Sequence, residues 1–141
     1  MKRHIRTLVA MVMVIMMISC LMASSASAAY DPEIPSNAPA SVGWTLYIGG
    51  DEYQVDSNAV VGWGSSGRNV YIVQIACNQL ANTHYINCAC GDADGVYGDN
   101  TNRGVKGFQS YCNSANINGT NQSVDGVVGA QTWNRFAYFL G

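Results

Sequence analysis

Residues 94–101 read Asp-Gly-Val-Tyr-Gly-Asp-Asn-Thr, and residues 125–132 read Asp-Gly-Val-Val-Gly-Ala-Gln-Thr. Both segments contain an Asp-Gly pair, an apolar pair, a second glycine and a threonine, in the same order. An Asp-Gly pair favours a tight turn, because glycine reaches positive φ without steric cost. The second glycine lets the chain reverse into a helix, and the threonine hydroxyl could satisfy free N–H groups in its first turn. The chain therefore uses one turn–helix unit twice.

Apolar residues follow each turn at the spacing of a helix face, which predicts helices over about Asp99–Tyr111 and Ala130–Phe139. Upstream, Gly64-Ser65-Ser66-Gly67 leads into a third apolar segment, from Val70 to Leu80. Its first four residues are mostly β-branched and would also suit a buried strand, so periodicity alone does not decide between helix and strand. The apolar positions of the three segments are Val70, Val73, Cys77, Leu80, Val105, Phe108, Cys112, Trp133, Phe136 and Leu140.

The ordered set of motifs over about residues 64–140 resembles the peptidoglycan-binding domain family. That family reads roughly G-x-x-G-x-x-V-x-x-L-Q, then D-G-x-F-G-x-x-T with a following F-Q, then D-G-x-V-G-x-x-T-W. The resemblance implies a small three-helix bundle, and it favours a helix over residues 70–80. It also implies non-catalytic attachment to bacterial cell-wall peptidoglycan. The matching residues are Gln74, Asp94, Gly95, Gly98, Thr101, Val105, Phe108, Gln109, Asp125, Gly126, Gly129, Thr132 and Trp133.

Apolar and polar residues alternate with a period of two on both sides of Gly49-Gly50, within residues 44–55, which predicts a β-hairpin. Two strands alone are marginal in water, so the hairpin should dock on another element. The first helix would be apolar on a second face, at Ile72 and Ile75, which we expect the hairpin to cover. The predicted fold is mainly α: a three-helix bundle with an N-terminal β-hairpin, stapled by disulfides. We assign 29–62 to an extended tether and hairpin arm and 63–141 to the peptidoglycan-binding-like domain.

Residues 1–28 have the features of a secretory signal peptide: a basic start, an apolar core and Ala26-Ser27-Ala28 as a cleavage site. The alternative is a lipoprotein signal that uses Cys20. We therefore expect a secreted protein associated with the cell wall and not with the membrane after cleavage. No hydrolase domain accompanies the module within these 141 residues, so we expect a free-standing binder, with a separate wall hydrolase as a second candidate partner.

After the signal peptide the chain keeps four basic and nine acidic residues, a formal charge of −5. Nucleic acid and anionic lipid need a basic face, which excludes them as expected partners. Thirteen asparagines with many serines and glycines suit a neutral, hydroxyl-rich or amide-rich ligand.

Four cysteines remain after removal of the signal peptide, an even number in a small exported domain, which predicts two disulfides. A bond between Cys88 and Cys90 would be strained, so Cys77 and Cys112 should each pair with one of them, in either combination. The spacing does not give two C-x-x-C zinc knuckles.

No catalytic constellation can be assembled from the sequence. His84 lies near no nucleophile motif, and both glutamates outside the signal lie in the N-terminal arm. A calcium loop around Asp92, Asp94 and Asp99 lacks its final acidic ligand, because Arg103 occupies that position. We therefore expect no enzyme activity, no cofactor and no metal.

We place the ligand surface at the two turn–helix joints, where backbone N–H groups stay free to meet a glycan or a stem-peptide carboxylate. Arg103 is the expected partner for such a carboxylate. The alternative function is a secreted protein-interaction module that recognises a protease or a cell-wall enzyme. The candidate ligand-binding residues are Asp94, Asn100, Arg103, Asn118, Gln122 and Trp133.

Overall fold

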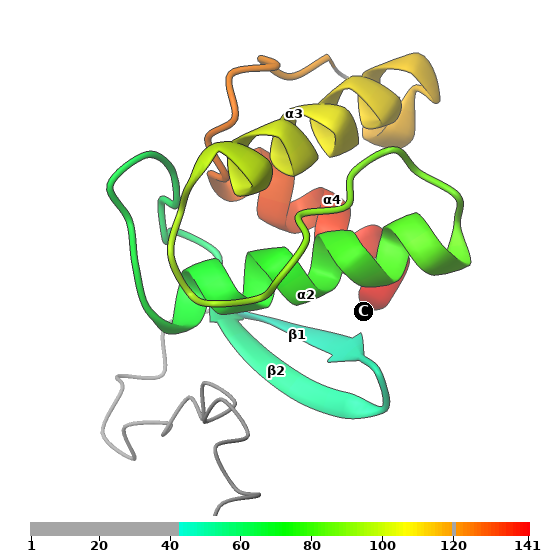
Figure 1. The fold of residues 1–141 in the computed structure, drawn as a ribbon. Coiled ribbons are helices and arrows are strands. Elements are labelled where there is room, and N and C mark those ends of the chain that lie inside the picture. Colours follow the sequence, from blue (N-terminus) through cyan, green and yellow to red (C-terminus); the bar gives the residue numbers. More distant parts are fainter. Residues whose placement is uncertain (1–42, 120) are drawn as a thin grey trace, which may run out of the picture. The chain divides into compact units, whose positions relative to one another are not determined.

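The computed structural model describes residues 43–119 and 121–141, so the predicted signal peptide and tether, Cys20 included, lie outside the described residues. The elements follow in the order β1 (Gly43–Ile48), β2 (Asp51–Asp56), α2 (Arg68–Thr83), α3 (Asp99–Ser114), the short 3-10 helix η1 (Ile117–Gly119) and α4 (Ala130–Leu140). Figure 1 shows α2 and α3 one above the other, with α4 behind them and the hairpin below α2. The three predicted helices and the hairpin are therefore confirmed, and each helix extends beyond the residues predicted for it by one to three residues at one or both ends.

The helix over Arg68–Thr83 forms despite its β-branched start, because both of its faces are covered. Val70, Val73 and Leu80 enter the core of the bundle, and Ile72 is fully buried as well. A helix with two covered faces gains packing free energy that outweighs the modest intrinsic preference of Val and Ile for strands. Tertiary packing thus resolves the ambiguity of this segment in favour of the helix.

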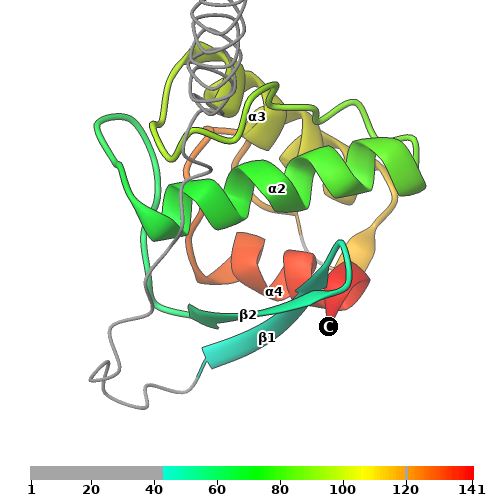
Figure 2. The ribbon, with the colours of Figure 1, turned by 60° about the horizontal axis from the view of Figure 1, so that its bottom comes forward.

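The hairpin docks as predicted on α2, and it contacts α4 too. Gly49 and Gly50 adopt φ of 64° and 97°, which only glycine takes without strain, and Ile48 pairs with Asp51 across this two-residue turn. Leu46 of β1 is fully buried. Side chains of α2 fasten the hairpin: Gln79 Oε1 accepts from the Gly49 N–H at 2.5 Å, and Arg68 Nη1 donates to the Gln54 carbonyl at 2.7 Å. In Figure 2 the hairpin runs beside α4.

The core between the helices is built on aromatic packing. Phe108 of α3 stacks on Phe136 of α4, with ring centroids 4.3 Å apart and parallel planes. Trp133 is fully buried beside Phe136, and its indole N–H donates to the Ala59 carbonyl at 2.8 Å. Aromatic pairs of this kind contribute about 0.5–1.5 kcal/mol beyond the area they bury. The second turn–helix unit is thereby tied to the segment that precedes α2.

The disulfide prediction is not supported, because Cys77, Cys88, Cys90 and Cys112 are all free thiols in the structure. All four are buried and serve as small core residues. The Cys88 thiol donates to the Cys77 carbonyl at 3.1 Å, and the Cys90 thiol lies 3.6 Å from the Cys88 carbonyl. Gly104 makes room for this loop on α3, since a Cβ there would lie 2.5 Å from Cys90 Sγ.

Hydrogen bonds among these thiols and their burial both shift their pKa values. Hydrogen bonds with the Cys88 and Cys90 thiols, together with burial, raise the pKa of Cys77 well above its ordinary value. Burial raises the pKa of Cys112 to about 11. The hydrogen bond with Cys77 lowers the pKa of Cys88. The thiolate is the reactive form of cysteine, but all four thiols are buried, so reagents should not reach them in the folded protein.

Candidate functional site

The first Asp-Gly turn is held by one glutamine of α2. Gln74 Nε2 shares its two hydrogens among three acceptors: Asp94 Oδ1 at 2.9 Å, the Val96 carbonyl at 3.1 Å and Thr101 Oγ1 at 2.9 Å. Gln74 Oε1 accepts from the Gly95 N–H at 2.9 Å. Asp94 Oδ1 also accepts from the Val96 N–H at 2.9 Å, which closes the turn on itself. One buried amide therefore fixes the turn and the first residues of α3 together.

The second turn repeats this arrangement with a glutamine of α3. Gln109 Nε2 donates to Asp125 Oδ1 at 3.2 Å, to the Val127 carbonyl at 2.9 Å and to Thr132 Oγ1 at 3.4 Å. Gln109 Oε1 accepts from the Gly126 N–H at 2.9 Å, and Asp125 Oδ1 accepts from the Val127 N–H at 2.8 Å. The sequence repeat is therefore a structural repeat, in which each helix clamps the turn that starts the next one.

The two helices begin in the same way. Gly98 and Gly129 precede α3 and α4 with φ, ψ of −114°, −167° and −112°, −167°, and neither helix start has a side-chain cap. The prediction that the hydroxyls of Thr101 and Thr132 satisfy free N–H groups in the first helical turn is wrong. These hydroxyls instead accept from Gln74 and Gln109. The first N–H groups of each helix therefore have no side-chain partner, and they carry the positive end of the helix dipole.

A shallow pocket lies at each helix start. The pocket at α3, here the α3 pocket, has a volume of about 380 Å³, and its lining includes Gln74, Asp92, Asp94, Asp99, Asn100 and Thr101. The pocket at α4, here the α4 pocket, has a volume of about 300 Å³, and its lining includes Gln109, Gln122, Asp125, Val127, Ala130 and Thr132. Each turn–helix unit therefore presents a hollow beside uncapped backbone donors.

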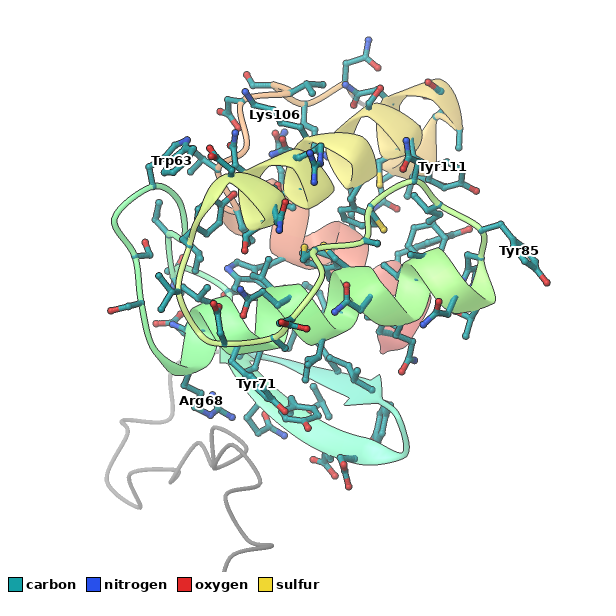
Figure 3. All side chains as sticks on the ribbon, viewed as in Figure 1. Trp63, Arg68, Tyr71, Tyr85, Lys106 and Tyr111 are labelled. Carbon is teal, nitrogen blue, oxygen red and sulfur yellow. The ribbon has the colours of Figure 1, made fainter. Side chains whose placement is uncertain are left out.

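The two turns are linked to each other through Tyr97. Its buried hydroxyl donates to the Gly126 carbonyl of the second turn, and burial raises the pKa of Tyr97. Trp63 packs edge-on against Tyr97, with ring centroids 6.2 Å apart, and stays 61% exposed. Figure 3 shows Trp63 on the loop that precedes α2. An exposed indole therefore lies beside the link between the two units.

The charge of Asp94 is favoured by its surroundings. The hydrogen bond from Gln74 lowers the pKa of Asp94 below its ordinary value of 3.8, and the bond from the Val96 N–H adds to this effect. Among residues 43–119 and 121–141, no cluster of three or more His, Cys, Asp or Glu side chains is arranged to hold a metal ion. The hydrogen bonds that the Asp94 carboxylate accepts come from Gln74 and from the Val96 N–H of the turn itself.

The structure distributes the predicted ligand residues over three places. Asp94 and Asn100 line the α3 pocket, and Gln122 lines the α4 pocket. Asn118 lines a third hollow and donates to Asn134 Oδ1 at 2.6 Å. The exposed Arg103 donates from Nη2 to Asn100 Oδ1 at 2.7 Å, which places it at the rim of the first unit.

Trp133 is the exception among these residues. Its side chain is 0% exposed and its indole N–H is occupied by the Ala59 carbonyl, so it is a core residue and not part of a ligand surface. Sequence reasoning also missed Val127, Ala130 and Gln131, which line the α4 pocket. Their position after the second Asp-Gly pair was the available signal, since they occupy the same places in the repeat as Val96, Asp99 and Asn100.

Comparison with known proteins finds no matching family model and no match among curated proteins. Two solved structures are similar. The crystal structure of the SleB N-terminal domain is 27% identical, with a TM-score of 0.45, over 58% of this chain and 93% of that one. A peptidoglycan-binding protein from Clostridioides difficile, in complex with glutamine hydroxamate, is 22% identical, with a TM-score of 0.46, over 63% of this chain and 47% of that one. Both TM-scores lie below 0.5, so neither likeness carries an argument about this chain.

Proposed function

We propose that this protein is an exported, non-catalytic module that binds bacterial peptidoglycan. The observation that carries the proposal is the pair of glutamine-clamped Asp-Gly turns, each of which sets an uncapped helix start beside a pocket. The clamps use Gln74, Gln109 and both Asp-Gly pairs, which are residues of the motif that resembles the peptidoglycan-binding family. The motif therefore builds the surface that we assign to the ligand.

The chemistry of the two pockets suits a neutral polymer with hydroxyl and amide groups. Backbone N–H groups, side-chain amides and hydroxyls line them, with carboxylates that can accept from hydroxyl or amide donors. A formal charge of −5 beyond the signal peptide opposes anionic polymers as the main attraction. Binding should therefore survive added salt, because screening weakens long-range attraction far more than direct hydrogen bonds.

Two exposed side chains extend this surface. Arg103 uses Nη2 to hold Asn100, and as an exposed guanidinium it has further donors to offer a stem-peptide carboxylate in the paired geometry that arginine favours. Trp63 offers an exposed aromatic face on which a sugar ring can stack. These two contacts are proposed for the parts of the ligand that lie outside the pockets.

A non-catalytic role is part of the proposal. The His84 ring lies 2.8 Å from the Thr83 hydroxyl and packs edge-on against Phe139. Glu52 lies on β2, where its carboxylate accepts from Gln54 at 3.0 Å. A glycosidase needs two carboxylates flanking a cleft, and Glu52 on a hairpin strand offers no such pair.

Among the described residues no helix is long and apolar enough to cross a membrane.

Co-sedimentation with purified sacculi tests this function. The secreted protein should pellet with sacculi, remain bound at raised salt, and release no soluble fragments from them. Arg103→Ala should fold normally and bind more weakly. Loss of wild-type retention would reject the function, and release of soluble fragments would reject its non-catalytic part. Retention on a protease or wall enzyme without retention on sacculi would instead favour the protein-interaction alternative.

A further inference from the structure

The two pockets occupy equivalent places in the repeat, yet they differ in charge. The α3 pocket has three carboxylates in its lining, those of Asp92, Asp94 and Asp99. At the equivalent places the α4 pocket has Ser123, Asp125 and Ala130. The α4 pocket therefore keeps only the carboxylate that closes the turn, and its helix has no acidic residue in the first turn.

The α4 pocket also contains a hydrogen-bond donor without a partner. Gln122 is 8% exposed and lines this pocket, and its side-chain nitrogen Nε2 is buried with no hydrogen bond. The rest of the residue is held in place. Its Oε1 accepts from Thr132 Oγ1 at 2.9 Å, while its backbone N–H donates to Asn113 Oδ1 at 2.9 Å and its carbonyl accepts from Asn113 Nδ2 at 2.9 Å. A buried donor left unpaired is costly, so it marks a place where an acceptor is missing.

The donors and acceptors of the α4 pocket together complement one functional group. Gln122 Nε2 and the uncapped N–H groups at the start of α4 can donate to a carbonyl oxygen. Asp125 is exposed, and the hydrogen bonds that it accepts from Gln109 and Val127 both use Oδ1, so Oδ2 can accept from an N–H. Val127 and Ala130 add apolar surface, and Val127 is 38% exposed.

We propose that the α4 pocket is a subsite for a secondary amide group. The amide carbonyl accepts from Gln122 and the start of α4, its N–H donates to Asp125, and its methyl or side-chain carbon packs on Val127 and Ala130. The negative charge of Asp125 at the wall favours this neutral group over a free carboxylate. The inference rests on the proposed function, since peptidoglycan carries secondary amides both as N-acetyl groups on its sugars and as peptide bonds in its stems.

Two variants remove the proposed complementarity in different ways. Gln122→Glu replaces the donor with an acceptor and keeps an oxygen for Thr132. Ala130→Asp places a carboxylate at the start of α4, at the position where α3 already carries Asp99, so the fold should tolerate it and the dipole should favour it. Ala115→Asp is the control for the added charge, since it places the same charge at the exposed C-cap of α3, outside the lining of the α3 and α4 pockets.

The test measures binding of three probes by NMR titration, with near-UV circular dichroism to confirm the fold of each variant. The probes are the tetramer of N-acetylglucosamine, the same tetramer without its acetyl groups, and N-acetyl-Ala-Ala-amide. Wild type and Ala115→Asp should bind an acetylated probe. The folded Gln122→Glu and Ala130→Asp proteins should bind it about two- to tenfold more weakly, because Gln122→Glu removes a donor and the carboxylate that Ala130→Asp introduces competes for the N–H groups at the start of α4. The deacetylated tetramer should not bind at the α4 pocket.

The probes separate the two sources of the amide. Preference for the acetylated tetramer would assign the pocket to the glycan strand, and preference for the peptide would assign it to the stem. Equal binding by wild type and Ala130→Asp, or no binding of either acetylated probe by wild type, would overturn the subsite. Sacculus retention of wild type and Ala130→Asp to the same extent would reject the subsite while leaving the proposed function standing.

Discussion

Replacement of Gln74 or Gln109 by methionine tests whether these glutamines hold the two Asp-Gly turns in place. Gln74→Met keeps the length of the side chain but removes its hydrogen bonding to four partners, three of which share the two hydrogens of Nε2. The partners on exposed Asp94 and Val96 can turn to water, whereas the Gly95 N–H and the Thr101 hydroxyl are left buried. A buried polar group without a partner costs about 1–3 kcal/mol, so Gln74→Met should lower the free energy of unfolding by about 2–6 kcal/mol.

The matched variant Gln109→Met should cost less, although the two clamps look alike. The Thr132 hydroxyl still donates to Gln122 Oε1 at 2.9 Å after the substitution, so only the Gly126 N–H is left buried without a partner. The expected loss is about 1–3 kcal/mol. Urea denaturation followed by circular dichroism and fluorescence would measure both values, provided that the two probes give coincident transitions. A loss below about 0.5 kcal/mol for Gln74→Met would refute the reasoning, since such a value is typical of ordinary surface substitutions. A loss for Gln109→Met that exceeds the loss for Gln74→Met would refute it as well.

Three further results are expected. Phe108→Ala should lower the free energy of unfolding by about 3–5 kcal/mol, because it removes a fully buried ring stacked on Phe136; thermal denaturation would measure this, and a loss under about 1 kcal/mol would contradict the described core. The pKa of Asp94 is lowered in the folded state, so its carboxylate stabilises the fold above the unfolded pKa, and this stabilisation is lost as pH falls through the folded pKa. The free energy of unfolding should therefore decline on acidification below about pH 4. Asp94→Asn should flatten that decline, and an unchanged pH profile would argue against the lowered pKa. The buried thiols of Cys77, Cys88, Cys90 and Cys112 should resist iodoacetamide at pH 8 in the folded protein and react in denaturant without a reductant; labelling that requires prior reduction would favour the disulfide prediction again.

Much of the fold could be predicted because the signals are local. The Asp-Gly turns, the helices that follow them and the Gly49-Gly50 hairpin each depend on a few neighbouring residues. The docking of the hairpin followed from a second apolar face on α2, which had to be covered. A set of short-range patterns was therefore enough to specify three helices, a hairpin and most of the core.

The errors arose where a prediction needed distances between segments. An even number of cysteines after a predicted signal peptide says nothing about where the sulfur atoms lie, and here the thiols engage backbone carbonyls such as those of Cys77 and Cys88. The sequence does not distinguish a core role from a ligand role for Trp133. The structure does, because its indole N–H donates to the Ala59 carbonyl. The unpaired donor of Gln122 is a property of the tertiary structure alone, although its residue had been chosen as a candidate.

The most direct test of the central claim is an NMR titration of ¹⁵N-labelled residues 29–141, the chain expected after signal cleavage, with peptidoglycan fragments solubilised by a muramidase. The account predicts chemical-shift changes at the starts of α3 and α4, including the backbone amides of residues 99–101 and 130–132 and the side-chain amide of Gln122. The hairpin and the exposed Tyr85, which lies far from the helix starts, should not respond. Changes confined to the hairpin or to Tyr85, or no changes at saturating fragment, would contradict it.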